Sequence, residues 1–282
     1  MRAIIIAIAS VLGLALIFPL AFVRQTHASS TDGTHTYLGF DRNDYPGDAA
    51  LAALRKTFTF SGYWLNAPPG ENATTWTGKR EALRANGFGF LVLFNGRLDK
   101  ELRRTPNAAA LGANDAAAAA KAAQTERFPP GTIIFLDQEE GGRMLPEQRA
   151  YLYAWIDGVN AAGYYAGIYC SGMPDVTDAG IITADDIREN ARGRQIAFFI
   201  YNDACPPSPG CVFSANKITP AQSGLPFASV WQVSQSPRRK NFTSRCRNTY
   251  AANGNCYPPG LAVEKLYVDI DVATSPDPSS EH

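Results

Sequence analysis

Short apolar stretches alternate with longer stretches of mixed polar and apolar residues along positions 36–274. Eight of the short stretches are rich in β-branched and aromatic residues and are apolar almost without interruption. Strands that are buried on both faces have this pattern, because neither face meets water. The eight predicted strands are TYLGFD, FTFSGYWL, FGFLVLFNG, GTIIFLDQE, YYAGIYCSG, QIAFFIYND, FASVWQVSQ and EKLYVDIDVA.

Helix-like segments separate the first six predicted strands, and irregular loops follow the sixth. Five strand–helix units followed by three strands predict an α/β fold, a single TIM-type (β/α) barrel of parallel strands over residues 36–274. Such barrels typically need about 250 residues, which suits this length. Helix N-caps are predicted at Asp48, at Asn114 or Asp115, and at Thr183, and helix ends at Gly87 and Gly163.

Both ends of the chain are predicted to lie outside the barrel. Residues 3–23 are apolar apart from Ser10, and Thr26-His27-Ala28 then offers a cleavage site with small residues at its first and third positions. Residues 1–28 therefore predict a secretory signal peptide, and the alternative is an uncleaved membrane anchor, because roughly 20 apolar residues can span a bilayer. In either case we expect a secreted, periplasmic or cell-envelope protein. Residues 275–282 are polar and predict a disordered tail.

The cysteines agree with an oxidising compartment. Cys205 and Cys211 flank one short loop, and Cys246 and Cys256 flank another. Each pair is close enough in sequence to form a local disulfide. Cys170 lies in an apolar strand and is predicted to be a small buried core residue.

Charge and histidine content exclude several classes of function. The 282 residues carry 26 basic and 26 acidic side chains, and this balance argues against nucleic-acid binding. The three histidines, at positions 27, 35 and 282, lie near the chain ends, which argues against a nucleophile–histidine triad. We expect a monomer with no metal and no cofactor, and membrane contact only through an uncleaved N-terminal segment.

Carboxylates collect at the ends of the predicted strands, where TIM barrels hold their catalytic residues. Asp41 ends the first strand, Asp137 and Glu139 lie at the end of the fourth, and Asp269 and Asp271 lie on the eighth. Side chains alternate along a strand, so Asp137 and Glu139 share a face. In a half-buried pair the pKa of one carboxyl is raised, which makes a general acid for glycosidic bond cleavage.

Other polar and aromatic residues near these ends are candidates for contact with a sugar. Aromatic rings can stack on sugar faces, although each ring can equally be a core residue. We favour Trp231, because the adjacent Gln232 adds an amide that can bind a hydroxyl or acetamido group. Glu140 is predicted to be a loop residue that pairs with Arg143. The candidate substrate-binding residues are Tyr63, Asn95, Tyr169, Trp231, Gln232 and Asp271.

Seven of these segments together resemble the bacterial glycoside-hydrolase-like barrels known as domain of unknown function 1906. The likeness covers nearly the whole chain after the N-terminal apolar segment. More distantly, the sequence is similar to glycoside hydrolase family 25, the lysozyme-type muramidases. The segments are YLGFDRNDYPG, FSGYWLNAPP, GFGFLVLFNGR, GTIIFLDQEEGG, AGYYAGIYCSG, SVWQVSQ and LYVDIDVA.

The resemblance implies roles for the carboxylates. Asp41 matches the Asp of the first strand, and Asp137 and Glu139 match an Asp-x-Glu motif in which Glu139 is the proton donor. Asp269 matches the final Asp, and Asp271 competes for that role. Asp137 would either attack the sugar or orient the substrate's own acetamido group.

Three functions are compatible with these observations. The leading hypothesis is a secreted glycoside hydrolase that acts on peptidoglycan or a related N-acetylated cell-wall glycan, with Glu139 as the general acid. The second is a non-catalytic glycan-binding barrel, in which Arg143 would hold Glu139. The third is a structural envelope protein with an unused cleft.

Overall fold

The computed structural model describes residues 35–202, 218–235 and 268–280. The predicted signal or anchor segment lies outside these residues, and so do the four cysteines of the predicted disulfides. Within the described ranges, no helix combines the length and apolar character needed to cross a membrane.

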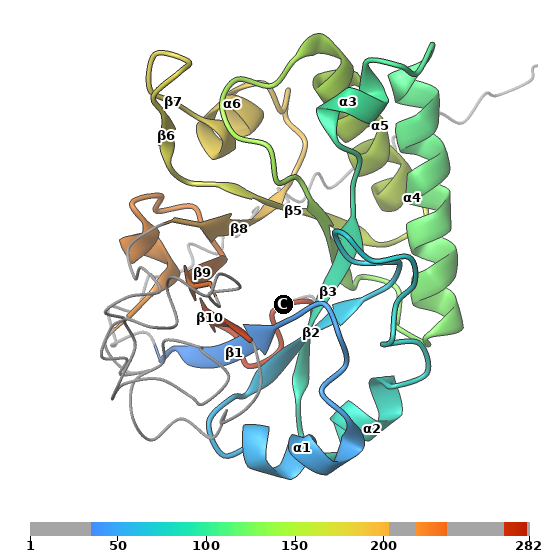
Figure 1. The fold of residues 1–282 in the computed structure, drawn as a ribbon, viewed down its shortest axis with the longest axis vertical. Coiled ribbons are helices and arrows are strands. Elements are labelled where there is room, and N and C mark those ends of the chain that lie inside the picture. The colour runs from blue at the N-terminus through green and yellow to red at the C-terminus, as the bar shows by residue number, and fades with distance from the viewer. Residues whose placement is uncertain (1–34, 203–217, 236–267, 281–282) are drawn as a thin grey trace, which may run out of the picture. The chain divides into compact units, whose positions relative to one another are not determined.

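Eight strands close into a mixed barrel in the order β1-β10-β9-β8-β5-β4-β3-β2 (Figure 1). Each of the eight predicted strands is present, so the prediction of an α/β barrel is confirmed. The strands are β1 (Tyr37–Asp41), β2 (Phe60–Trp64), β3 (Gly89–Asn95), β4 (Ile133–Asp137), β5 (Tyr165–Ser171), β8 (Ala197–Tyr201), β9 (Val230–Ser234) and β10 (Asp269–Ala273).

The direction of the last strand differs from the prediction. β10 runs antiparallel to both of its neighbours, β1 and β9, whereas the other neighbouring strands of the barrel are parallel. A wholly parallel barrel was therefore the wrong expectation. A strand made of apolar residues is buried equally well whether it runs parallel or antiparallel to its neighbours. The apolar pattern therefore does not reveal the direction of the strand.

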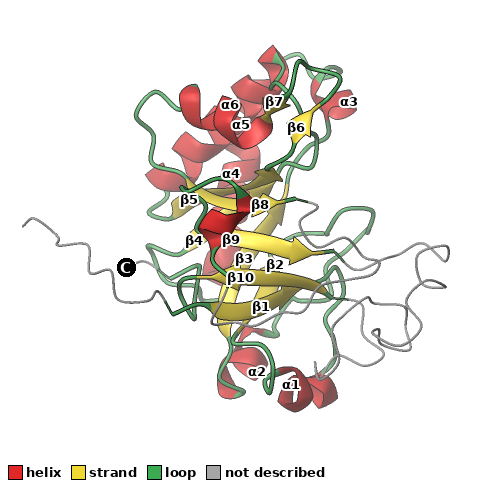
Figure 2. Ribbon diagram, turned by 90° about the vertical axis from the view of Figure 1, so that its left-hand side faces the viewer, coloured by secondary structure: helices red, strands yellow, loops and turns green. Residues whose placement is uncertain are grey.

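The helices lie outside the ring of strands (Figures 1 and 2). A short hairpin, with strands β6 and β7, follows β5 and leads into α6. The elements are α1 (Asp48–Leu54), α2 (Arg80–Ala85), α3 (Asp99–Leu102), α4 (Ala108–Thr125), α5 (Pro146–Ala161), β6 (Pro174–Asp175), β7 (Ile181–Ile182), α6 (Thr183–Glu189) and the 3₁₀ helix η1 (Pro220–Ser223).

The predicted N-caps of three helices are wrong. Asp48 is the first residue of α1, and Gly47 is at its N-cap position. α4 begins before Asn114, and the side chain of Asn107 caps it by accepting a 3.0 Å hydrogen bond from the N–H of Ala110. Asp115 instead lies inside the helix and forms a 2.7 Å ion pair with Arg97. Thr183 is the first residue of α6 rather than its cap, and its hydroxyl donates to a backbone carbonyl outside the helix.

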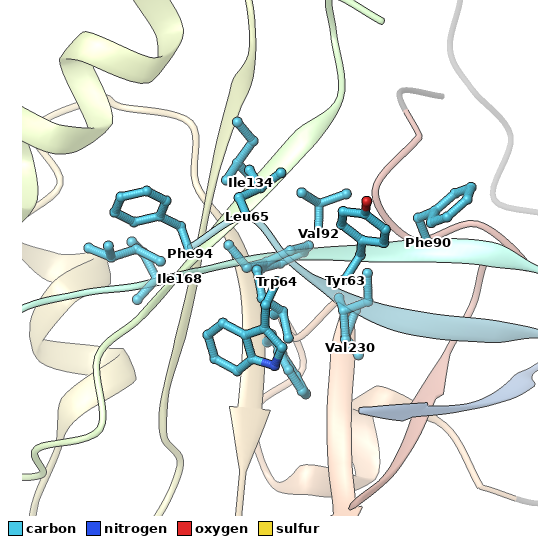
Figure 3. Packing of buried hydrophobic residues seen from close by; sticks show 14 of the residues in the cluster. Tyr63, Trp64, Leu65, Phe90, Val92, Phe94, Ile134, Ile168 and Val230 are labelled. Atoms are coloured by element: carbon cyan, nitrogen blue, oxygen red, sulfur yellow. The ribbon is translucent and has the colours of Figure 1, made fainter. Parts of the chain in front are cut away.

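The core contains two apolar layers, one inside the barrel and one between the strands and the helices. Tyr63 and Trp64, which are adjacent on β2, leave the strand in opposite directions (Figure 3). Tyr63 packs against the rings of Phe90 and Phe128 outside the barrel. Cys170 is fully buried, as predicted. The strand ends are thus held by packing on both faces.

The C-terminal segment 275–280 is bound to the barrel, so the predicted disorder is wrong for these residues. The N–H of Phe90 donates to the carboxylate of Asp277, and the N–H of Val92 donates to the hydroxyl of Ser279, each at 2.7 Å. The N–H of Ile133 donates to the carbonyl of Ser279 at 2.7 Å. A polar composition permits this order because the segment's polar groups accept from backbone donors of β3 and β4.

Candidate functional site

The predicted carboxylates meet at one rim of the barrel. The register places Asp41 of β1 opposite Asp269 of β10, and Asp137 of β4 opposite Tyr169 of β5. Residues paired across neighbouring strands point to the same face of a sheet. Because β10 runs in the reverse direction, its first residue, Asp269, lies beside the last residue of β1. The sequence thus predicted the location of Asp269 correctly, although not the strand direction that produces it.

A chain of hydrogen bonds across β1, β9 and β5 holds Asp41. The amide of Gln232 donates to Asp41 Oδ2 at 2.9 Å, and the hydroxyl of Tyr169 donates to Gln232 Oε1 at 2.8 Å. Gln235 Nε2 donates to the same Oε1 at 3.0 Å and lies 3.3 Å from the Tyr169 hydroxyl. These contacts fix which end of the Gln232 amide faces Asp41.

Asp137 and Glu139 occupy different environments. Asp137 is buried, and its Oδ1 has no hydrogen-bond partner within the described part of the chain, whereas Glu139 is exposed. Burial raises the pKa of Asp137 well above its ordinary value, and the charges of Glu139 and Asp41 raise it further. The charge of Glu139 thus acts on Asp137 as predicted, but β4 ends at Asp137, so Glu139 lies in the loop beyond the strand and not on the strand face that the sequence interpretation gave it.

The raised pKa of Asp137 predicts a dependence of stability on pH. A carboxyl whose pKa is raised by folding contributes stability that is complete below its unfolded pKa and is lost as the pH rises through its folded pKa. We therefore expect Asp137→Asn to gain stability relative to wild type as the pH increases from about 4 to 8. Urea unfolding of both proteins across this range measures the difference. A constant difference across the range would contradict the assignment.

Asp271 lies inside the barrel and is fully buried. Burial raises its pKa well above the ordinary value, and the charges of Asp41 and Asp269 raise it further. The pKa of Tyr169 is also raised, first by burial and then by the charges of Asp137, Asp41 and Asp269. Burial and the neighbouring carboxyl groups therefore raise the pKa of both Asp271 and Tyr169.

Two of the predicted sugar-binding residues do not lie in this site. The ring of Tyr63 is fully buried on the outer side of β2, and its hydroxyl donates to Glu126 at 2.5 Å. Trp231 is paired with Ile200, and it points to the side of β9 opposite to Gln232, which is the outer side of the barrel. Its indole N–H donates to Asn202 at 3.0 Å. Both predictions are corrected, because alternation within an apolar strand does not reveal which set faces inward.

Asn95 ends β3 on the same face as Asp137, but its side chain is engaged by the chain after β2. Its amide donates to the carbonyl of Ala67 at 2.9 Å. The side chain of Asn66 both accepts from the N–H of Asn95 and donates to its carbonyl. In this structure Asn95 therefore positions the loop.

The inner face includes two aromatic residues at strand ends that are not among the candidate substrate-binding residues. Trp64 points to the inner side of β2, whereas the adjacent Tyr63 points outward. The indole N–H of Trp64 donates to the carbonyl of Arg42 at 3.1 Å. Tyr201 is half-buried and stacks on Tyr169 with ring centroids 5.8 Å apart. Each residue ends its strand, and β2 carries no charged residue that would indicate its inward set.

Glu140 lies in the loop after β4, and its hydrogen bonds are with residues other than Asp137 and Glu139. Glu140 accepts hydrogen bonds from the N–H of Asp99 at 2.6 Å and from the amide of Gln148 at 2.9 Å. Glu140 is thus a loop residue, as predicted. Its predicted partner is wrong, because the ion pairs of Arg143 are with Asp178 and Asp186, both at 3.9 Å.

Solved structures of low sequence identity are similar to this chain. An uncharacterised protein from B. stearothermophilus is 18% identical, with a TM-score of 0.49, over 84% of this chain and 95% of its own. The Mycobacterium tuberculosis Tat-secreted protein Rv2525c is 13% identical, with a TM-score of 0.49, over 84% and 94%. A bacterial lysozyme from Streptomyces coelicolor is 12% identical, with a TM-score of 0.44, over 83% and 90%.

A search of curated protein sequences gave no significant match. A family model does match the central part of the chain, which includes β3, β4 and β5. The family resemblance predicted from the sequence is thereby confirmed: residues 66–196 match the Rv2525c-like, glycoside hydrolase-like domain.

Proposed function

We propose that this protein hydrolyses glycosidic bonds in peptidoglycan or a related N-acetylated cell-wall glycan. The observation that carries the proposal is the pair formed by buried Asp137 and exposed Glu139 at the barrel rim. Glycoside hydrolysis uses two carboxyl groups whose environments separate their pKa values. The glycoside hydrolase-like family of residues 66–196 supports the same chemistry.

Glu139 is the proposed general acid, because it is the exposed member of the pair and can reach a bound glycan. In the free protein the proton resides on Asp137, whose pKa is raised by burial and by the charge of Glu139. A glycan that covers the rim removes water from Glu139 and makes its ionised form less favourable. The proton that the coupled pair shares then passes to Glu139, which donates it to the leaving oxygen as the glycosidic C–O bond breaks. The ionised Asp137 then either bonds to the anomeric carbon or orients the substrate's acetamido oxygen to do so, and water hydrolyses this intermediate and returns the proton.

The other rim residues bind and orient the sugar in this proposal. Asp41, held by Gln232, presents a fixed negative charge next to the developing positive charge on the sugar ring. Asp269 lies beside it in the register. Tyr201, stacked on Tyr169, offers an aromatic surface, and Gln235 offers an amide for a hydroxyl or acetamido group.

We further propose that the protein acts as a monomer outside the cytoplasm. The apolar N-terminal segment supports export, and the cysteine pairs support an oxidising compartment. Fractionation of cells that express the full chain, followed by mass determination of the mature protein, tests export and cleavage together. A mature protein that retains residues 1–28 would favour the anchor.

A non-catalytic glycan-binding barrel is the second candidate function. It is favoured by the hydrogen bonds among Asp41, Gln232 and Tyr169, which engage side chains that a hydrolase would direct at its substrate. Incubation of purified cell walls with the protein, followed by mass spectrometry of the soluble products, separates the two functions. Binding without release of glycan fragments would support the binding module.

Gly62 gives a further test, because it lies against Asp41. A Cβ atom added at position 62 would lie 2.6 Å from the Cβ and 3.0 Å from the Cα of Asp41. We expect Gly62→Ala to displace Asp41 and to lower turnover by about 10²-fold, the effect of a small misplacement of a catalytic group. Product release from cell walls measures the change.

Gly141→Ala is the matched control for this variant. It lies in the rim loop after β4, and its added Cβ would come no closer than 4.0 Å to other atoms. We expect Gly141→Ala to retain turnover close to wild type. Equal turnover in the two variants would show that the position of Asp41 does not matter.

A further inference from the structure

The carboxyl group of Asp271 is enclosed by the barrel, and no backbone or amide N–H of the described residues donates a hydrogen bond to it. Its side chain is 0% exposed, and neither oxygen accepts a hydrogen bond from an N–H or hydroxyl group of the described residues. In the register it lies opposite Gly39 of β1 and Gln232 of β9. A buried carboxylate without donors is costly, whereas a neutral carboxylic acid is much less so.

The groups around Asp271 determine whether Asp271 or Asp41 carries a proton that the two carboxyl groups can share. The ionisable groups that face it are Asp41 from β1 and Asp269 from its own strand, while β9 presents the uncharged Gln232. Asp41 is two positions along β1 from Gly39, the register partner of Asp271, and Gln232, the other register partner of Asp271, is bound to Asp41, so the two carboxyl groups are neighbours on the inner face. Two carboxyl groups can share a hydrogen bond only if one of them carries a proton. Asp41 already accepts from the Gln232 amide at 2.9 Å, which stabilises its ionised form.

We propose that Asp271 is a positioning residue, a neutral carboxylic acid that donates a hydrogen bond to Asp41 from inside the barrel. Together with Gln232 it holds the Asp41 carboxylate from two strands and directs the remaining acceptor capacity of Asp41 to the rim. The catalytic consequence rests on the proposed glycan hydrolysis, whereas the hydrogen bond itself does not.

The chemistry of Asp271 suggests an unusual pair of substitutions. Asp271→Asn retains a neutral group with an N–H donor of similar shape, so it should replace the neutral acid. Asp271→Leu has a comparable size but no donor. We expect the Asn variant to keep turnover of cell-wall glycan within about threefold of wild type and the Leu variant to lose about 10²-fold in kcat, with a smaller change in KM. Folding of both variants is checked by thermal unfolding.

Infrared spectroscopy tests the proton without any need for activity. A protonated carboxylic acid has a carbonyl stretching band that ionised carboxylates lack. We expect the wild-type protein at pH 7 to contain a band that disappears in Asp271→Asn and shifts in Asp41→Ala, which removes the acceptor. The band of Asp137, identified with Asp137→Asn, is the internal comparison, since its pKa is also raised.

The outcomes separate this proposal from the proposed function. Absence of the Asp271 band, or a folded Asn variant as inactive as the Leu variant, overturns the positioning role. If the wild type releases no glycan fragments, the proposed hydrolysis fails, and the infrared band still decides whether Asp271 donates to Asp41. A band that is present but unaffected by Asp41→Ala would also overturn the proposal.

Discussion

Replacement of Glu139 by Gln is expected to lower the release of glycan fragments from purified cell walls by about 10²–10⁴-fold, the usual contribution of a general acid. Gln keeps the size of the side chain and removes the proton that the leaving oxygen requires. Because Glu139 is exposed, the change should leave the fold intact. Loss of turbidity, with mass spectrometry of the released fragments, measures the rate and the bond that is cut.

Glu140→Gln is the matched control for this prediction. Glu140 is the next residue in the chain, but its Oε2 accepts from the Asp99 N–H and the Gln148 amide, and a Gln oxygen can accept the same bonds. We expect this variant to retain the wild-type rate. If Glu139→Gln and the wild type release fragments at the same rate, Glu139 is not the acid. If neither releases fragments but both bind walls, the glycan-binding module is correct.

A chain that stops after Ala273 is expected to lose at least about 3 kcal/mol of unfolding free energy, because three backbone donors lose their acceptors. These donors are the N–H groups of Phe90, Val92 and Ile133, which bind Asp277 and Ser279 at 2.7 Å. Each unsatisfied buried donor costs about 1–3 kcal/mol. Urea unfolding of the truncated and full chains measures the loss.

Two smaller changes control the truncation. A chain that stops after Ser280 keeps all three acceptors and should have the stability of the full chain. Ser279→Ala removes only the hydroxyl that accepts from Val92, so it should cost about 1–3 kcal/mol. A truncation after Ala273 that unfolds at the wild-type urea concentration would show that segment 275–280 does not stabilise the barrel.

The sequence predicted the strands well because each is a dense apolar run, and burial on two faces leaves that pattern whatever the topology. It also placed Asp41, Asp137 and Asp269 at one rim, because strand ends are where the apolar runs stop. Their roles in catalysis stay predictions. The apolar pattern does not show in which direction a strand runs or which of its side chains point into the barrel. For this reason the antiparallel direction of β10 and the outward-facing side chain of Trp231 were not predicted.

The predictions for segment 275–280 and for the start of α4 were wrong for a different reason. Both depend on single hydrogen bonds between residues, and the composition of a segment does not report such bonds. Ser279 is polar, yet it is almost fully buried because it accepts from Val92. Asp115 looked like a helix cap, but its carboxylate is bound by Arg97. The partner in each case lies outside the segment that was being interpreted.

The pairing of β1 with β10 determines when the site comes into existence during synthesis. Asp41 and Gln232 are separated by 191 positions in the chain, and Asp271 arrives later still. A nascent chain that has not delivered β10 has an open sheet rather than a barrel, and it lacks the groups that orient Asp41. We therefore expect assembly of the rim to be a late folding event, because it requires contacts between residues far apart in the chain.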